Sequence, residues 1–357
     1  MSDDRNTVAM LREYLLLPGE PDEHLNPMWL AHRLSIPERD LLGALAYAVR
    51  DGLVELRWEV YCPVCGRSPG EFGSLKEAHS NAECAACESC FDLHLDRDVR
   101  VTFSATESIR RMRGREGATL PLKDDAEHAT RGLDLLLIPS FWELFSGDAP
   151  ADDESLRIGR VAILFTDLRG STAMYAERGD PRAYRLVRDH FAILGERIDR
   201  NRGSLVKTIG DAVMASFATG ADAVRAALES QAELRTHAEE MGGELVLKAG
   251  VHAGACLAVR LNGRLDFFGG AVNTAARVQG LSHGHDVVVT DAVVADIVAE
   301  GGTCAAQTRI AESFDAELRG ITTPVSVHRL IRLEADGPCV AGQAPDKTIP
   351  SSCPITV

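Results

Sequence analysis

Residues 160–217 decide the fold of this chain, and they begin with RVAILFTDLRGST, residues 160–172. The apolar run in this segment predicts a β-strand that leads directly into a carboxylate, Asp167. Residues 170–172 then begin a helical segment, whose first N–H groups have no partner within the helix and attract anions. The segment therefore places Asp167 beside the N-terminus of a helix that can bind an anion.

The same region ends with LVKTIGDAVMASF, residues 205–217. Two short apolar runs are separated only by Gly210 and Asp211, a dipeptide that favours a tight hairpin turn, so we expect Asp211 at the hairpin tip. If the strand that carries Asp167 neighbours this hairpin in one sheet, the two carboxylates converge beside the helix start. Two acids and N–H donors suit a divalent metal and a polyphosphate.

Length and composition indicate a soluble globular protein. The 357 residues allow two or more domains, and 45% of them are hydrophobic and 25% charged. A formal net charge of −15 disfavours non-specific binding to nucleic acid or to an anionic membrane. The N-terminus lacks a secretory signal pattern and the sequence lacks an apolar run of about 18 residues, so we expect a cytoplasmic protein without a membrane span.

The N-terminal residues predict three helices followed by a short strand. This order is that of a winged-helix-like module, which we assign to residues 1–60. The third helix, PERDLLGALAYAVRDG at residues 37–52, would contact DNA in such a module, but its two basic residues, Arg39 and Arg50, are outnumbered by nearby acidic ones. Contact with an unknown protein or small-molecule effector, or dimerisation, is therefore favoured over nucleic-acid binding.

Five cysteines with CxxC spacing lie within residues 62–90. Two CxxC turns about twenty residues apart are typical of a zinc ribbon, in which four thiolates surround one structural Zn²⁺ per chain. We expect this ribbon over residues 61–103, with Cys84 as the spare thiol and His79 as an outside alternative. The predicted ligands are Cys62, Cys65, Cys87 and Cys90. Buried free cysteines and a redox pair are the competing interpretations.

Residues 104–156 predict a connector between the ribbon and a second domain. The connector contains a polar basic segment, an amphipathic segment at residues 133–145, and the acidic linker SGDAPADDES at residues 146–155. We expect a catalytic domain over residues 157–333 and a disordered tail over residues 334–357.

The expected order of elements in the catalytic domain is strand, helices, hairpin, helix, strand, hairpin and helix. The first strand spans residues 160–166, and helices are predicted at residues 171–178, 181–201, 220–240 and 271–281. A βαββαβ order indicates an α+β, ferredoxin-like fold, with the first strand beside the hairpin in the middle of an antiparallel sheet. This arrangement supports the convergence of Asp167 and Asp211.

Three motifs, FTDLRGST, VKTIGDAVMASF and RLDFFGGAVNTAAR, resemble those of class III nucleotidyl cyclases, the adenylate and guanylate cyclase catalytic family. The resemblance covers most of residues 158–333. It implies that two Mg²⁺ or Mn²⁺ ions per active site are held by Asp167, Leu168 and Asp211. It further implies substrate-binding roles for Lys207, Asp266, Gly170, Ser171, Thr172 and Arg319, and catalytic roles for Asn273 and Arg277. The N-terminal half resembles a bacterial subgroup of these cyclases with a zinc-knuckle regulatory region.

The resemblance implies an adenylate cyclase that converts ATP to 3′,5′-cyclic AMP and pyrophosphate. Lys207 and Asp266 complement the acceptor nitrogen and the exocyclic amine of adenine, which favours ATP over GTP. The family also implies a homodimer with two composite active sites. The alternatives are a guanylate cyclase and a nucleotide-sensing zinc-ribbon and winged-helix regulator without catalysis. Retention of both metal carboxylates and of Arg277 favours catalysis.

Overall fold

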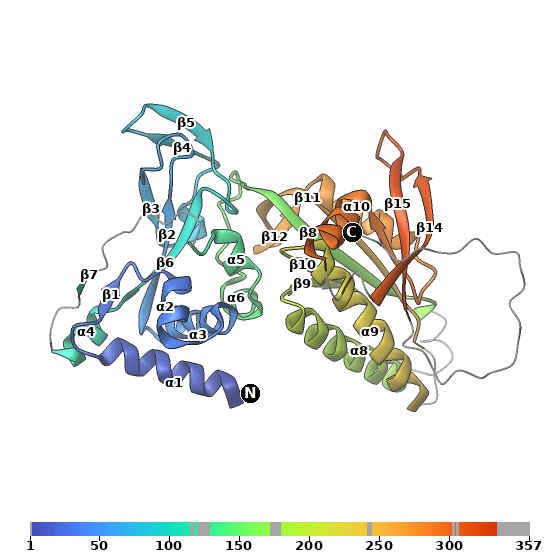
Figure 1. Ribbon diagram of the computed structural model, residues 1–357, viewed down its shortest axis with the longest axis horizontal. Coiled ribbons are helices and arrows are strands. Elements are labelled where there is room, and N and C mark those ends of the chain that lie inside the picture. The colour runs from blue at the N-terminus through green and yellow to red at the C-terminus, as the bar shows by residue number, and fades with distance from the viewer. Residues whose placement is uncertain are drawn as a thin grey trace, which may run out of the picture. The chain divides into compact units, whose positions relative to one another are not determined.

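The computed structural model describes residues 2–114, 118–119, 129–171, 180–240, 245–301, 304 and 307–333. The chain divides into two compact units (Figure 1). The first unit consists of residues 1–160 together with residues 255–269, and the second consists of residues 161–254 and the residues from 270 onward. A hairpin from the middle of the predicted catalytic domain therefore belongs to the same unit as the N-terminal half.

The first unit begins with the three predicted helices, α1 (Ser2–Leu16), α2 (Pro27–Leu34) and α3 (Glu38–Arg50). Asn26 caps α2, because its side chain accepts a hydrogen bond from the N–H of Met28 at 2.9 Å. The α3 helix buries one apolar face of leucine and alanine residues. Short elements of the unit are β1 (Pro21–Glu23), β7 (Ala118–Thr119), α4 (Glu107–Arg113), α5 (Gly132–Leu136) and α6 (Pro139–Phe145).

A three-stranded sheet with the order β3-β2-β6 follows the helices. Its strands are β2 (Val54–Val60), β3 (Gly70–Phe72) and β6 (Val99–Ala105). Trp58 of β2 is fully buried and contacts the rings of Phe72 and Phe141. Because β6 pairs with β2 over its whole length, the predicted winged-helix-like module and the predicted ribbon share one sheet.

Between β3 and β6 lie a 3-10 turn, η1 (Leu75–Glu77), and a separate hairpin of β4 (Asn81–Cys84) and β5 (Ser89–Asp92). The β4–β5 turn contains Cys87, and the other CxxC turn follows the end of β2. Both cysteine motifs are thus turns at strand ends.

The second unit is built on a mixed sheet with the order β14-β15-β13-β11-β8-β10-β9, and β12 pairs with the part of β11 that belongs to the first unit. The strands are β8 (Leu156–Leu168), β9 (Ser204–Ile209), β10 (Ala212–Phe217), β11 (Leu247–Leu261), β12 (Arg264–Phe268), β13 (Val287–Thr290), β14 (Thr308–Ala316) and β15 (Val325–Arg332). The long strands β8 and β11 extend into both units. Residues 161–166 of β8 are all buried, so both faces of this central strand are covered.

The predicted pairing of the first strand with the hairpin is confirmed, because β10 pairs antiparallel with β8. The prediction of a purely antiparallel sheet is wrong at one pair, since β11 and β13 are parallel. The connection between these two strands runs through β12 and a helix, α10 (Gly270–Gly280), and the helix allows the parallel crossover.

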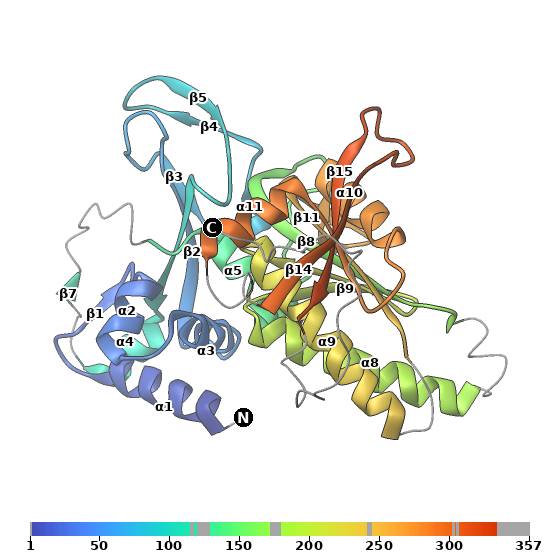
Figure 2. The same ribbon diagram turned by 45° about the vertical axis from the view of Figure 1, so that its right-hand side comes forward.

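The helices α8 (Asp180–Arg200) and α9 (Gly220–Glu240) lie side by side (Figures 1 and 2), and α11 (Asp291–Glu300) packs on α9. The α8 and α9 helices bury apolar faces in the same core as β8 and β10. Of the predicted helix at residues 171–178, only Ser171 lies within the described residues, and the predicted tail at residues 334–357 lies outside them. Among the described helices, none has both the length and the apolar character that crossing a membrane requires.

Candidate active site and thiol cluster

Asp167 and Asp211 lie at the neighbouring ends of β8 and β10. The register pairs Val213 with Thr166, and the N–H of Leu168 donates a hydrogen bond to Oδ2 of Asp211 at 3.3 Å. Burial raises the pKa of Asp167, and the charge of Asp211 raises it further. A divalent cation would relieve the unfavourable ionisation of Asp167, and the hard oxygen donors of the two carboxylates fit Mg²⁺ or Mn²⁺.

The turn after β8 contains the predicted phosphate-binding residues. Gly170 is exposed and has a φ of 73°, a backbone conformation that residues with a Cβ rarely adopt. The N–H of Arg169 donates to the carbonyl of Val246 at 2.9 Å, which anchors the turn to the segment before β11. Ser171 is half-buried at the end of this turn, whereas Thr172 lies outside the described residues.

Lys207 and the two predicted catalytic residues, Asn273 and Arg277, belong to different elements of the second unit. Lys207 is half-buried on β9, opposite Met214 of β10. Asn273 and Arg277 are both exposed on α10, four residues apart and therefore on one helix face. The opposite face of α10 is buried, and it includes Val278.

Asp266 belongs to the first unit, on β12. Its side chain is buried, and Oδ1 accepts a hydrogen bond from the N–H of Phe267 at 2.8 Å. Arg319 lies in the exposed turn between β14 and β15. The structure thus brings Asp167, Leu168 and Asp211 together, and it assigns Asp266 to the other unit.

Lys248 is a candidate site residue that the sequence analysis missed. Its positive charge lowers the pKa of Asp167, although burial and the charge of Asp211 raise that pKa by more, and its Nζ donates to the carbonyl of Gly280 at 3.1 Å. A cation beside a metal-binding carboxylate is suited to bind the phosphates of a nucleotide. The sequence feature that could have indicated Lys248 is a single lysine within the otherwise apolar strand sequence LVLKAGVHAG.

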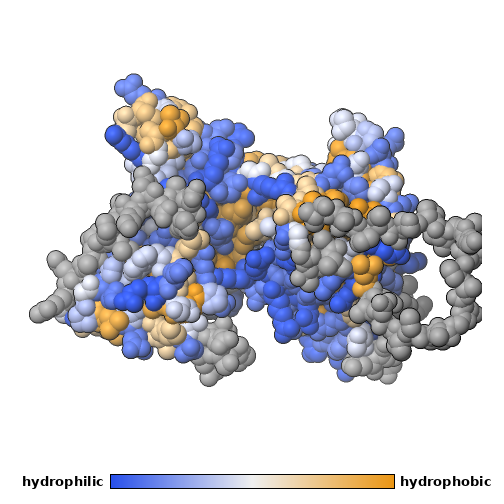
Figure 3. All heavy atoms as spheres, viewed as in Figure 1, coloured by the Kyte–Doolittle hydropathy of each residue, from blue (hydrophilic) through white to orange (hydrophobic). Residues whose placement is uncertain are grey.

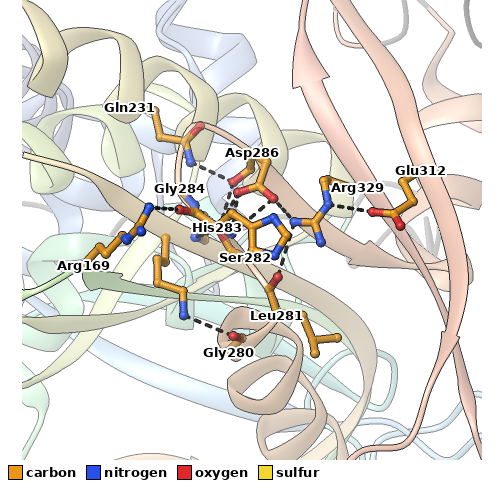
Figure 4. A network of polar contacts seen from close by, with 12 residues as sticks. Arg169, Gln231, Gly280, Leu281, Ser282, His283, Gly284, Asp286, Glu312 and Arg329 are labelled. Atoms are coloured by element: carbon orange, nitrogen blue, oxygen red, sulfur yellow. Dashed lines mark hydrogen bonds and ion pairs between the residues drawn. The ribbon is translucent and has the colours of Figure 1, made fainter.

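The loop after α10 is fixed by a polar network (Figure 4). The buried Asp286 accepts hydrogen bonds from the hydroxyl of Ser282 at 2.7 Å and forms an ion pair with Arg329. Arg169 donates to the carbonyl of His283 at 3.3 Å. The network therefore connects the end of the helix that carries Arg277 to the turn that follows Asp167.

His190 on α8 is a second residue that the sequence analysis missed. It is fully buried, and neither of its ring nitrogens has a hydrogen-bond partner among the described residues. Burial lowers the pKa of His190 to about 4, while the charge of Asp211 acts in the opposite direction. A histidine on the apolar face of an amphipathic helix gives no sequence signal that separates a core position from a site position.

Four thiols converge in the first unit, and the predicted set needs one correction. The Sγ atoms of the cluster lie within 4.8 Å of one another, and the cluster consists of Cys62, Cys65, Cys84 and Cys87. Cys90 pairs with Glu83 inside the β4–β5 ladder, so it is Cys84, at the end of β4, that lies with the other three. His79 is outside the cluster and contacts Glu154 at 2.9 Å.

The geometry of this thiol cluster fits a metal. In each CxxC turn the first cysteine carbonyl accepts a turn hydrogen bond, from Gly66 at 2.9 Å and from Glu88 at 2.7 Å. A hydrogen bond with Ser89 lowers the pKa of Cys62 to about 6, whereas, against a backbone hydrogen bond with Arg67, the pKa of Cys65 is raised to about 11 by burial and by its thiol neighbours. Four sulfur donors suit zinc or iron. The outer end of the β4–β5 hairpin is hydrophobic in places (Figure 3), and Val64 near the cluster is 71% exposed.

Comparisons with known proteins divide the chain in a similar way. Residues 154–325 match the family described as the adenylate and guanylate cyclase catalytic domain, and residues 7–135 match a family of unknown function. An adenylate cyclase of Anabaena cylindrica is 31% identical over 170 residues, which cover 42% of this chain and 34% of that protein. An adenylate cyclase of Mycosarcoma maydis is 30% identical over 170 residues, which cover 41% of this chain and only 7% of that protein.

Among solved structures, the adenylyl cyclase CyaB from P. aeruginosa is similar at 18% identity with a TM-score of 0.41, covering 50% of this chain and 96% of that chain. By the family match and by the motifs that they carry, residues 154–325 are similar to the adenylate and guanylate cyclase catalytic domain.

Proposed function

We propose that this chain is an adenylate cyclase that converts ATP to 3′,5′-cyclic AMP and pyrophosphate. The observation that carries the proposal is the joining of β8 and β10 through the Leu168 N–H and the Asp211 carboxylate, which brings two metal-binding acids to one edge of the sheet. The raised pKa of Asp167 supports a site that is completed by a divalent cation.

Asp167, Leu168 and Asp211 would hold two Mg²⁺ or Mn²⁺ ions, which activate the ribose 3′-hydroxyl and neutralise the leaving pyrophosphate when they are bound. Arg277 donates to the equatorial oxygens of the α-phosphate, where charge develops during in-line displacement. Asn273, on the same exposed face of α10, orients the ribose so that the attack is effectively unimolecular. Gly170 and Ser171 bind the phosphates, and Arg319 is a further candidate contact.

Lys207 and Asp266 make the enzyme selective for ATP. A lysine donates to a ring nitrogen of adenine, and a carboxylate accepts from the exocyclic amine. Guanine presents a carbonyl and a donor nitrogen instead, which this pair does not complement. A guanylate cyclase is therefore the less favoured activity.

The active form is a homodimer with two composite sites. Ile209 and Phe268 are large apolar residues that are 56% and 55% exposed, and a second copy of the chain would cover them. One subunit supplies Asp167 and Asp211, and the other supplies the purine-reading and transition-state groups. A two-fold axis then generates two equivalent sites.

The thiol cluster holds one structural Zn²⁺ through Cys62, Cys65, Cys84 and Cys87. Four protein ligands leave no open coordination position, so the metal stabilises the fold and takes no part in the reaction. The described cysteines are free thiols, which is consistent with a cytoplasmic location. The N-terminal region then regulates the cyclase in response to a protein or small-molecule effector.

The proposal is tested by incubating the purified full chain with ATP and Mn²⁺ or Mg²⁺ and separating the products by chromatography. We expect cyclic AMP and pyrophosphate in equal amounts, and no product from Asp211→Asn, because one lost ligand prevents assembly of the metal pair. A protein that binds ATP but releases no cyclic nucleotide with either metal would instead be a nucleotide-sensing regulator.

A further inference from the structure

We infer that residues 142–154 position the strand that carries Asp266, and that Arg260 is a positioning residue for purine selectivity. The inference rests on the proposed function, because it concerns how Asp266 is presented to the base. All the contacts that support it lie within the first unit.

The residues on either side of Asp266 both contact this segment. The N–H of Leu265 donates to the carbonyl of Ser146 at 2.7 Å. The ring of Phe267 packs edge-on against Trp142, with ring centroids 5.5 Å apart. Both Leu265 and Phe267 are buried. The position of the Asp266 backbone therefore depends on α6 and on the residue that follows it.

Trp142 is itself held in place. Its Nε1–H donates to the carbonyl of Leu136 at 2.6 Å, and its side chain is buried. The ring thus presents a fixed surface to Phe267, and aromatic pairs of this kind add stability beyond the burial of their area.

Arg260 secures the neighbouring strand of the same hairpin. It lies on β11 directly opposite Leu265. Its Nε donates to the carbonyl of Pro150 at 2.9 Å and its Nη2 donates to the carbonyl of Ala149 at 2.8 Å. A guanidinium can serve two adjacent carbonyls at once because its donors are fixed in one plane, and a lysine ammonium cannot reproduce this geometry.

The same segment is also bound by residues 74–80, which lie between the two cysteine motifs of the thiol cluster. The Ser74 hydroxyl donates to Asp148, and Glu154 accepts from the N–H and the hydroxyl of Ser80 at 2.7 and 2.6 Å. His79 also contacts Glu154. Residues 74–80 lead directly into β4, which ends at Cys84. A continuous series of contacts therefore runs from the thiol cluster to the strand that carries Asp266.

Through these contacts, a structural change in the N-terminal half can alter the position of Asp266, the proposed purine-reading carboxylate. Asp266 is buried and its Oδ1 accepts a hydrogen bond from the Phe267 N–H, so a shift of the β12 backbone moves the carboxylate with it. A displacement of about 1 Å in a positioned group is enough to change catalysis substantially. Loosening residues 142–154 should therefore reduce discrimination between ATP and GTP.

The test uses the full chain with Arg260→Ala, Arg260→Lys and Trp142→Leu, and with Arg264→Ala as the matched control. Arg264 is an exposed arginine on β12, two residues before Asp266. Hydrogen exchange of the peptide that contains residues 261–268 is measured together with kcat/KM for ATP and for GTP. Thermal melting identifies any variant that has lost its fold.

We expect faster exchange at residues 261–268 and an ATP:GTP ratio lowered about tenfold in Arg260→Ala and Trp142→Leu. Arg260→Lys should recover only part of the ratio, and Arg264→Ala should match the wild type in both measurements. Unchanged exchange in Arg260→Ala and Trp142→Leu would overturn the inference, as would faster exchange with an unchanged ATP:GTP ratio. A wild-type chain that makes no cyclic nucleotide would refute the proposed function, and the exchange measurement would still decide whether residues 142–154 hold β12.

Discussion

Gly250→Ala should displace the helix that carries Asn273 and Arg277. Gly250 lies on β11, and a Cβ at this position would be 2.2 Å from the backbone nitrogen of Gln279 and 2.3 Å from its Cα. These are backbone atoms of α10, so no side-chain rotation relieves the clash. Restoring ordinary contact requires the end of α10 to move by roughly 1.2 Å.

Gln279 follows Arg277 by two residues, so this movement displaces the arginine that we propose to contact the α-phosphate. A shift of this size is expected to lower kcat on the order of 100-fold. Overpacking should also lower the free energy of unfolding by about 1–3 kcal/mol, which leaves a typical domain folded. The assay is steady-state cyclic AMP formation at saturating ATP and Mn²⁺, with thermal melting of the same preparation.

Gly280→Ala is the matched control. Gly280 ends the same helix, and a Cβ there would meet no atom within 4 Å. This variant should retain wild-type kcat and be as stable as the wild type or slightly more stable, because alanine restricts the unfolded chain. If Gly250→Ala retained full activity, or if Gly280→Ala lost as much as Gly250→Ala, the close approach of β11 to α10 would not be what positions Arg277.

Three other predictions test the metals and the base. Cys84→Ser should lower zinc content from about one per chain and destabilise the β4–β5 hairpin, whereas Cys90→Ser should retain zinc, as measured by metal analysis and limited proteolysis; the reverse result would restore Cys90 as the ligand. The pKa of Asp167 is higher in the folded state than in the unfolded state. Ionisation of Asp167 therefore destabilises the metal-free protein as the pH rises above the pKa of the unfolded state. Asp167→Asn should therefore melt higher than wild type at pH 7 in EDTA, lose that advantage near pH 4, and gain nothing from Mn²⁺; a lower melting temperature at pH 7 would contradict this. Lys207→Glu combined with Asp266→Cys should reduce kcat/KM for ATP far more than for GTP, and an equal loss for both nucleotides would refute the base-reading roles.

The elements of the catalytic domain were largely predictable, because their signals are local. The β9–β10 hairpin turns at Gly210 and Asp211 as predicted, since these residues interrupt two apolar runs and Gly210 has a φ of 65°. The α9 helix also has its predicted bounds. The proximity of Asp167 and Asp211 followed from the order of the elements.

The remaining features depend on contacts between distant residues. Arg260 binds Pro150, which lies 110 residues earlier, and no local pattern indicates this contact. The choice of Cys84 over Cys90 depends on where β4 ends, because a shift of three residues exchanges one CxxC motif for the other. Lys248 and His190 were missed because their closeness to the carboxylate pair is a property of the packed sheet and helices.

The central claim is that Asp167 and Arg277 act in one cyclase site that two copies of the chain build together. Its most direct test is to co-express differently tagged Asp167→Ala and Arg277→Ala chains, isolate the heterodimers by sequential affinity steps, and measure cyclic AMP formed from ATP and Mn²⁺. Each variant alone should be inactive, and each heterodimer should recover at most about half of the wild-type activity, because one of its two sites retains both groups. Heterodimers that form but remain as inactive as either parent would contradict the claim.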